Sequence, residues 1–148
     1  MKISLTKFLV VLTLILIFES TGCSNDNSTS QYHKSAKKFN SIYFEIVECI
    51  DLGNTIKSLE RLQSEENSKK IDELGNIIKD IKNNIPKDRE QLYNTFNERY
   101  ENLVYLKESY EKLESFNEDD RGKIDTIFIS IGLEKDNWKD KNSSIIWD

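Results

Sequence analysis

The chain has 148 residues, of which 32% are charged and 37% hydrophobic, with one proline and five glycines. This length suits a single domain, and the composition favours a helical, well-solvated domain over a sheet protein. The formal charge is -5, and acidic and basic residues are interspersed without a lysine or arginine block. We expect no nucleic-acid partner, because such a surface needs a concentrated positive face.

Residues 1–22 have the pattern of a secretory signal peptide. Lys2 and Lys7 give a basic start, and "FLVVLTLILIF" (residues 8–18) is apolar except for Thr13. A membrane-spanning helix needs about 20 apolar residues, so this run is short for a span. A basic start and a short apolar core are typical of a cleaved leader. An uncleaved membrane anchor is the alternative.

The four residues that follow, Ser20-Thr21-Gly22-Cys23, resemble the lipobox of bacterial lipoproteins. Ser20 stands where that family usually has Leu, Val or Ile. The resemblance implies cleavage before Cys23 and a diacylglycerol on its sulfur, which would anchor the chain to the extracytoplasmic face of the cell membrane. Ser20 and Gly22 also suit an ordinary signal peptidase, which would leave Cys23 as a plain cysteine on a secreted protein.

After Cys23 comes "SNDNSTSQ", which contains no large apolar residue. Such a segment cannot bury enough surface to offset the entropy of ordering. We therefore expect residues 23–31 to hold the lipidated cysteine and a flexible polar tether.

Residues 32–133 are predicted to form a helical bundle. The first helix is indicated by apolar residues that recur at spacings of three and four, one face of a helix. They are Tyr32, Ala36, Phe39, Tyr43, Ile46, Val47 and Ile50. Gly53 is expected to end this helix in the left-handed conformation.

Residues 55–84 carry two apolar sets separated by the polar run "QSEENSKK". A turn in that run would make two helices. The pairs Glu65/Lys69 and Glu66/Lys70 instead support a continuous helix, because Glu four residues before Lys is the favourable orientation. We expect one long helix, and the two-helix reading stays open.

Ile85-Pro86 is expected to break the chain before a third helix of about 28 residues, roughly 42 Å long. Asp88 and Gln91 have the spacing of a capping box at its start. Its apolar stripe includes Leu92, Phe96, Tyr100, Leu103, Val104, Leu106, Tyr110 and Leu113. Short links at Gly53 and Pro86 imply antiparallel neighbours. The predicted fold is therefore all-α, an elongated antiparallel three-helix bundle with a short fourth C-terminal helix.

The fourth helix is expected to begin at Asn117, because three acidic residues follow it and favour a helix start. Ile124, Ile127, Phe128 and Ile131 then recur at helical spacing, whereas Ile127, Ile129 and Ile131 alternate as in a strand. A lone strand would have no partner, so we favour a helix. Residues 134–148 are expected to form a polar tail. Its apolar cluster, Trp138, Ile145, Ile146 and Trp147, could dock on the bundle or contact a partner.

No catalytic motif is present: the sequence has no glycine-rich phosphate loop, nucleophile elbow or cluster of metal ligands. A calcium loop at residues 117–128 is unfavourable because Arg121 and Phe128 occupy ligand positions. His33, the only histidine, is interpreted as an exposed residue at the end of the tether. We expect no enzyme activity, no cofactor and no metal.

Two further groups are interpreted as structural. Cys49 would pack as a small apolar side chain, although it could pair with Cys23 if Cys23 carried no lipid. The aromatic residues of the third helix, Tyr93, Phe96, Tyr100 and Tyr110, are expected to pack in the core and not to line a glycan or peptide groove.

The sequence therefore predicts a membrane-anchored envelope lipoprotein that acts as a non-catalytic binding or scaffolding module. The lipid on Cys23 would reach the membrane, and the domain would contact a protein or cell-envelope partner. The alternative is a secreted or anchored inhibitor or immunity-type protein that blocks another protein. The net negative charge suits a basic partner in that case.

Overall fold

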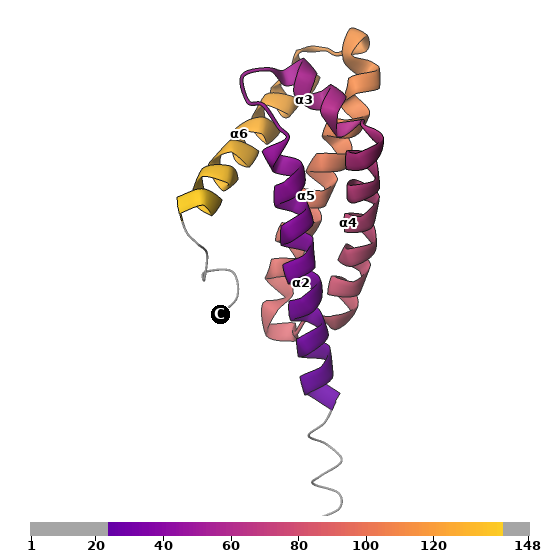
Figure 1. Cartoon of the computed structure of the whole chain (residues 1–148), viewed down its shortest axis with the longest axis vertical. Helices are drawn as coiled ribbons and strands as arrows, with labels where there is room; N and C mark the ends of the chain where they lie inside the picture. The colour runs from indigo at the N-terminus through magenta and orange to yellow at the C-terminus, as the bar shows by residue number, and fades with distance from the viewer. Residues whose placement is uncertain (1–23, 141–148) are drawn as a thin grey trace, which may run out of the picture.

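The computed structural model describes residues 24–140, and every regular element in that range is helical (Figure 1). The α-helices are α2 (Ser24–Glu48), α3 (Thr55–Leu62), α4 (Glu65–Asn84), α5 (Glu90–Ser109) and α6 (Glu118–Asp140). Two 3-10 helices are η1 (Lys87–Arg89) and η2 (Tyr110–Ser115). The all-α class is confirmed. None of the described helices is both long and apolar enough to cross a bilayer.

Helices α2, α4 and α5 run lengthwise beside one another, with α2 packed on α4 and α4 on α5 (Figure 1). The chain rises through α2, descends through α4 and rises again through α5. Helix α3 and η2 lie together at the upper end. Helix α6 leaves that end at an angle and contacts α2.

The apolar stripe predicted for the first helix is confirmed, since all seven of its residues are buried. Helix α2 nevertheless begins at Ser24, so residues 24–31 are helical where a flexible tether was expected. These residues contain no Pro or Gly, and extending a formed helix fixes one residue per hydrogen bond gained. His33 is only partly exposed and lies with its ring 5.3 Å from that of Tyr32.

The loop between α2 and α3 does not use the predicted left-handed glycine. Gly53 has no positive φ, so that prediction is wrong. The Asp51 carboxylate accepts a hydrogen bond from the Gly53 amide at 3.0 Å. Asn54 then caps α3 by accepting from the Lys57 amide at 3.0 Å. Side-chain acceptors thus shape the turn without a left-handed residue.

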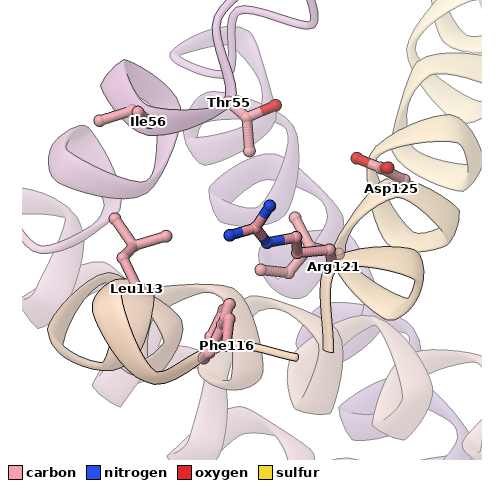
Figure 2. Close-up of a pocket in the computed structure, with 7 residues that line it drawn as sticks. Thr55, Ile56, Leu113, Phe116, Arg121 and Asp125 are labelled. Carbon is pink, nitrogen blue, oxygen red and sulfur yellow. The ribbon is translucent and has the colours of Figure 1, made fainter. Parts of the chain in front are cut away.

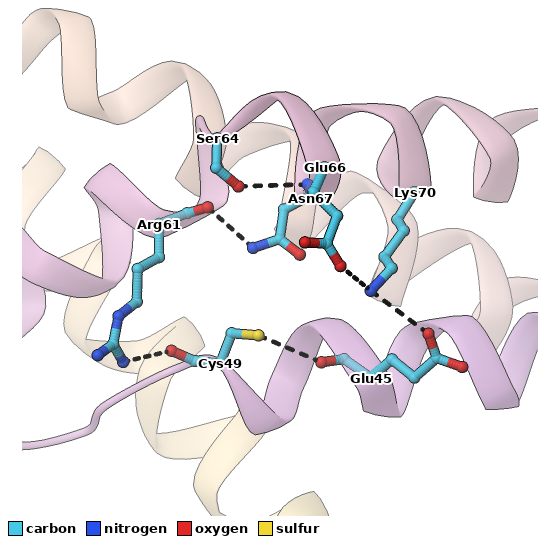
Figure 3. A network of polar contacts seen from close by, with 7 residues as sticks. All are labelled: Glu45, Cys49, Arg61, Ser64, Glu66, Asn67 and Lys70. Atoms are coloured by element: carbon cyan, nitrogen blue, oxygen red, sulfur yellow. Dashed lines mark hydrogen bonds and ion pairs between the residues drawn. The ribbon is translucent and has the colours of Figure 1, made fainter.

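The expected single helix over residues 55–84 is wrong, because the chain breaks between α3 and α4. The Ser64 hydroxyl accepts from the Asn67 amide at 3.3 Å, and the Asn67 side chain donates to the Arg61 carbonyl at 2.9 Å (Figure 3). The Glu66–Lys70 ion pair does form, but inside α4. A surface pair of this kind is worth only about 0.2–0.5 kcal/mol, less than a typical cap of about 1 kcal/mol.

The corner between α3 and α4 is tied to the end of α2 (Figure 3). The Arg61 guanidinium donates to the Cys49 carbonyl at 3.0 Å, which satisfies a carbonyl at the helix end. Lys70 lies 3.4 Å from the Glu45 carboxylate of α2. The Cys49 thiol is free and half-buried, and it donates to the Glu45 carbonyl at 3.5 Å.

The predicted break at Pro86 is confirmed, with Ile85 in an extended conformation. The capping box is not formed, because Asp88 lies inside η1 and α5 begins at Glu90 without a side-chain cap. The third helix is also shorter than expected, since α5 has 20 residues and tightens into η2.

The aromatic residues of α5 and η2 pack against the core as expected. Phe96 is buried edge-on to Phe39, with ring centroids 5.1 Å apart. Tyr93, Tyr100 and Tyr110 are partly buried against the same core.

The predicted start of the fourth helix is confirmed. Asn117 accepts from the Asp120 amide at 2.9 Å, and Asp120 accepts from the Asn117 amide at 3.2 Å. This reciprocal pair is a capping box. Ile127 and Ile131 are buried whereas Ile129 is 65% exposed, so the segment is a helix and not a strand. At 23 residues α6 is not short, and it runs through the predicted boundary at residues 133–134.

Gly75 brings α4 and α5 together. A Cβ at this position would lie 2.7 Å from the Tyr100 hydroxyl oxygen and 3.0 Å from the ring carbon that bears it. No real Cβ contact is that short, so the ring would have to move. Gly75 therefore leaves room for the tip of the Tyr100 ring against α4.

We predict that Gly75→Ala destabilises the fold by about 1–3 kcal/mol, because overpacking outweighs the gain in helix propensity. Gly122→Ala is the matched control, since no heavy atom lies within 4 Å of its added Cβ. That variant should gain about 0.5–1 kcal/mol, the ordinary benefit of Ala over Gly in a helix. Urea unfolding of both variants measures the difference. A stabilised Gly75→Ala protein would contradict the steric role.

Candidate functional site

Within residues 24–140, no group of three or more His, Cys, Asp or Glu side chains is placed to hold a metal ion. Two adjoining hollows at the upper end of the molecule are the strongest candidates.

The first hollow, here called the η2 pocket, lies between α3, η2 and α6 (Figure 2) and has a volume of about 400 Å³. It is lined by Thr55, Ile56, Leu113, Phe116, Arg121, Ile124 and Asp125. Figure 2 shows the Arg121 guanidinium reaching into the space between Leu113, Phe116 and Thr55. The pocket thus combines apolar walls with one cationic group.

The local sequence explains how this pocket forms. The last turns before Phe116 are 3-10 helix, and Phe116 itself is extended. The Asn117–Asp120 capping box then starts α6 in a new direction. Because the chain turns here beneath α3, side chains from η2 and from the first turns of α6 face the same space (Figure 2).

The second hollow, here called the α6 groove, continues from the first and has a volume of about 460 Å³. It is lined by Leu52, Thr55, Asp125, Phe128, Ile129, Gly132, Leu133 and Asp136. Thr55 and Asp125 line both hollows, so the two hollows adjoin along α6.

Exposed apolar side chains gather at these two hollows. Among the described residues, five large hydrophobic side chains are exposed, and four of them line the two hollows. The four are Leu52 (51% exposed), Ile56 (62%), Ile129 (65%) and Leu133 (62%). The fifth, Leu92, lies on α5. A clustered apolar patch with a polar rim is typical of an interaction site.

Gly132 lines the α6 groove. A Cβ there would lie 2.9 Å from a methyl carbon of Leu52, so the Leu52 side chain would have to shift. Glycine inside a helix lowers helix stability by about 1 kcal/mol relative to Ala. At Gly132 it also leaves the space that Leu52 occupies. Asp125 and Asp136 lie along the groove and give it a negative rim.

A buried polar cluster, here called the α6 clamp, fixes α6 against α2 and α5. Tyr43 donates to the Glu134 carboxylate at 2.8 Å. The Arg99 Nε lies 3.2 Å from both oxygens of Glu134, and the Arg99 guanidinium also donates to the Asn40 side chain at 3.2 Å. Its carbon lies 5.2 Å from the centre of the Tyr43 ring. The clamp therefore joins three helices through charge-assisted hydrogen bonds.

The environment of Tyr43 changes its acidity. The ring is only 2% exposed. Burial raises the pKa of Tyr43 far above its ordinary value, and the nearby Glu134 carboxylate raises it further. The neutral phenol is thereby kept as a hydrogen-bond donor to Glu134.

None of the residues predicted as a site has a described side chain. Cys23 and the segment Ile145–Trp147 lie outside the described residues. Trp138 belongs to α6, but its side chain is likewise outside what the structure describes.

The exposed apolar patch was missed by sequence analysis. One signal was available: Ile129 and Leu133 are four residues apart and lie off the buried stripe of α6, which indicates a second apolar face.

No protein-family model matches this chain, and no curated protein or solved structure matches it either.

We predict that alkaline pH weakens the fold through Tyr43. The folded chain holds the phenol proton more tightly than the unfolded chain, whose tyrosine pKa is about 10. Stability is therefore fully present below about pH 10 and falls as the pH rises beyond it. Tyr43→Phe should flatten this fall, because the variant has no phenol proton to lose at this position. Urea midpoints at increasing pH test this, and an equally steep fall in Tyr43→Phe would contradict it.

Proposed function

We propose that this protein is a membrane-anchored bacterial envelope lipoprotein that acts as a non-catalytic binding or scaffolding module. The observation that carries the binding role is the gathering of four of five exposed large apolar side chains around the η2 pocket and α6 groove. The membrane role rests on the lipobox-like residues before Cys23.

The anchor has a simple physical basis. Each buried methylene contributes about 0.8 kcal/mol, so one acyl chain holds a protein only marginally and two hold it stably. A diacylglycerol on Cys23 would supply two chains. The protein would then be located at the extracytoplasmic face of the cell membrane.

The position of α2 supports a binding site held at a distance from the membrane anchor. Helix α2 begins at Ser24, directly after Cys23, and has 25 residues. At 1.5 Å per residue it is about 37 Å long. The two hollows lie at the end of the molecule opposite the start of α2 (Figure 1). An anchor on Cys23 would therefore present the partner surface away from the bilayer.

We infer that α2, α4 and α5 work as an elongated antiparallel three-helix bundle that acts as a spacer. The packing of α2 on α4 and of α4 on α5 supports this reading. The contact between Gly75 of α4 and the tip of Tyr100 of α5 supports a close pairing of these two helices.

The chemistry of the surface describes the partner. Its apolar side chains would enter the η2 pocket and the α6 groove, and basic groups would face Asp125 and Asp136. The net charge of -5 suits the same kind of partner. An inhibitor or immunity-type protein is the second candidate, favoured by this acidic rim. The inhibitor role differs from the scaffolding role in one expected result, because an inhibitor would abolish the activity of its partner on binding.

We predict that Cys23→Ala moves the mature protein from the detergent phase to the aqueous phase in detergent phase partitioning, because both acyl chains would be lost. Cys49→Ala is the matched control and should remain in the detergent phase. Unchanged partitioning of Cys23→Ala would remove the lipid anchor from the proposal.

We also predict that Ile56→Asp weakens partner retention by about tenfold or more. The variant loses the apolar contact that Ile56 would make with the partner and places a charge there instead. Leu92→Asp is the control, because Leu92 is exposed on α5 away from both hollows. Both proteins would be used as bait for solubilised envelope proteins, with quantitative mass spectrometry of what each retains. Equal retention by the two variants would place the partner elsewhere. A retained enzyme that loses activity on binding would favour the inhibitor role.

A further inference from the structure

We propose that the chain's own segment 141–148 folds back over the α6 groove and covers its exposed apolar side chains. Ile145, Ile146 and Trp147 would then pack on Ile129 and Leu133. The segment reads "KNSSIIWD", so a polar start is followed by three large apolar residues.

The reach of the segment fits the α6 groove. Helix α6 ends at Asp140. Leu133 and Ile129 lie seven and eleven residues earlier, about 10 Å and 16 Å back along the helix. An extended chain spans up to about 3.3 Å per residue, so Ile145 reaches about 17 Å and Trp147 about 23 Å from Asp140. All of the exposed apolar side chains on α6 are within that reach.

The η2 pocket is beyond the same reach. Arg121 lies nineteen residues before Asp140, about 28 Å back along α6. The segment would therefore cover the groove and leave the pocket with Arg121 open.

The residues of the segment suit a reversal of direction. Asn142, Ser143 and Ser144 are residues that favour turns, because their side chains hydrogen-bond nearby backbone groups. They bury no apolar surface, so the apolar contact begins only at Ile145.

The groove offers what the segment needs. Leu52, Ile129 and Leu133 are each more than half exposed. A buried tryptophan usually finds an acceptor for its indole N–H, and the Asp125 and Asp136 carboxylates line the groove.

Charge favours the segment over a second copy of the chain. A symmetric pair of grooves would bring the Asp125 and Asp136 carboxylates of the two copies toward each other, which is unfavourable. The side chains of the segment carry no net charge, because Lys141 is balanced by Asp148, so its docking brings no comparable repulsion.

Fluorescence of the protein as isolated from cells tests this contact. The chain has two tryptophans, so Trp138→Phe leaves Trp147 as the only reporter. Trp147 should emit at shorter wavelength than tryptophan amide and be less accessible to acrylamide. Adding Ile129→Asp or Leu133→Asp should lower the ratio of docked to free segment about tenfold, the effect of losing burial of one large aliphatic side chain.

The matched control is Leu92→Asp in the same background, which should leave Trp147 protected. All three substitutions replace exposed side chains, and circular dichroism checks that each variant stays folded. The proposal would be overturned if acrylamide quenched Trp147 as readily as tryptophan amide. It would also be overturned if neither groove substitution changed the protection of Trp147. Protection that rises with protein concentration would also overturn it, in favour of a second copy. Docking in this assay needs no partner, so its outcome is separate from that of the proposed function.

Discussion

The ion pair between Arg99 and Glu134 fixes where α6 lies, and the candidate surface exists only while α6 stays there. Arg99 and Glu134 are 14% and 27% exposed, so water screens their attraction only partly. Tyr43 and Asn40 hold the pair in place from α2. Helix α6 also meets the rest of the molecule through a stripe of isoleucines and Phe128, and through Lys135, whose ammonium donates to the Val47 and Ile50 carbonyls. Loss of the ion pair would therefore loosen one wall of both hollows.

Two glycines inside helices leave room for side chains of neighbouring elements. The tip of the Tyr100 ring lies against α4 at Gly75, and a methyl group of Leu52 lies against α6 at Gly132. Each glycine weakens its own helix by about 1 kcal/mol relative to Ala. At both places a neighbouring side chain occupies the space that a Cβ would take. The first contact belongs to the α4–α5 pair, and the second lies in the α6 groove.

Local patterns predicted the core well and the site poorly. The stripe from Tyr32 to Ile50 and the start of α6 at Asn117 follow from spacing and capping within one segment. The break at Ser64 depended on Asn67 reaching back to Arg61, which no periodicity reveals. The α6 clamp joins Tyr43 to Glu134, 91 residues away, so no spacing rule could pair them. Exposure of Ile129 and Leu133 likewise depended on where α6 packs.

The groove and the segment together set how tightly any partner can bind. A partner that needs the α6 groove meets it open only in the fraction of molecules whose segment 141–148 is undocked. Its apparent affinity is the intrinsic affinity multiplied by that fraction. The η2 pocket stays open in both states, because the segment does not reach Arg121. A partner can therefore make a first contact at the η2 pocket and then displace the segment. Two adjoining hollows of different accessibility would in this way serve one binding event.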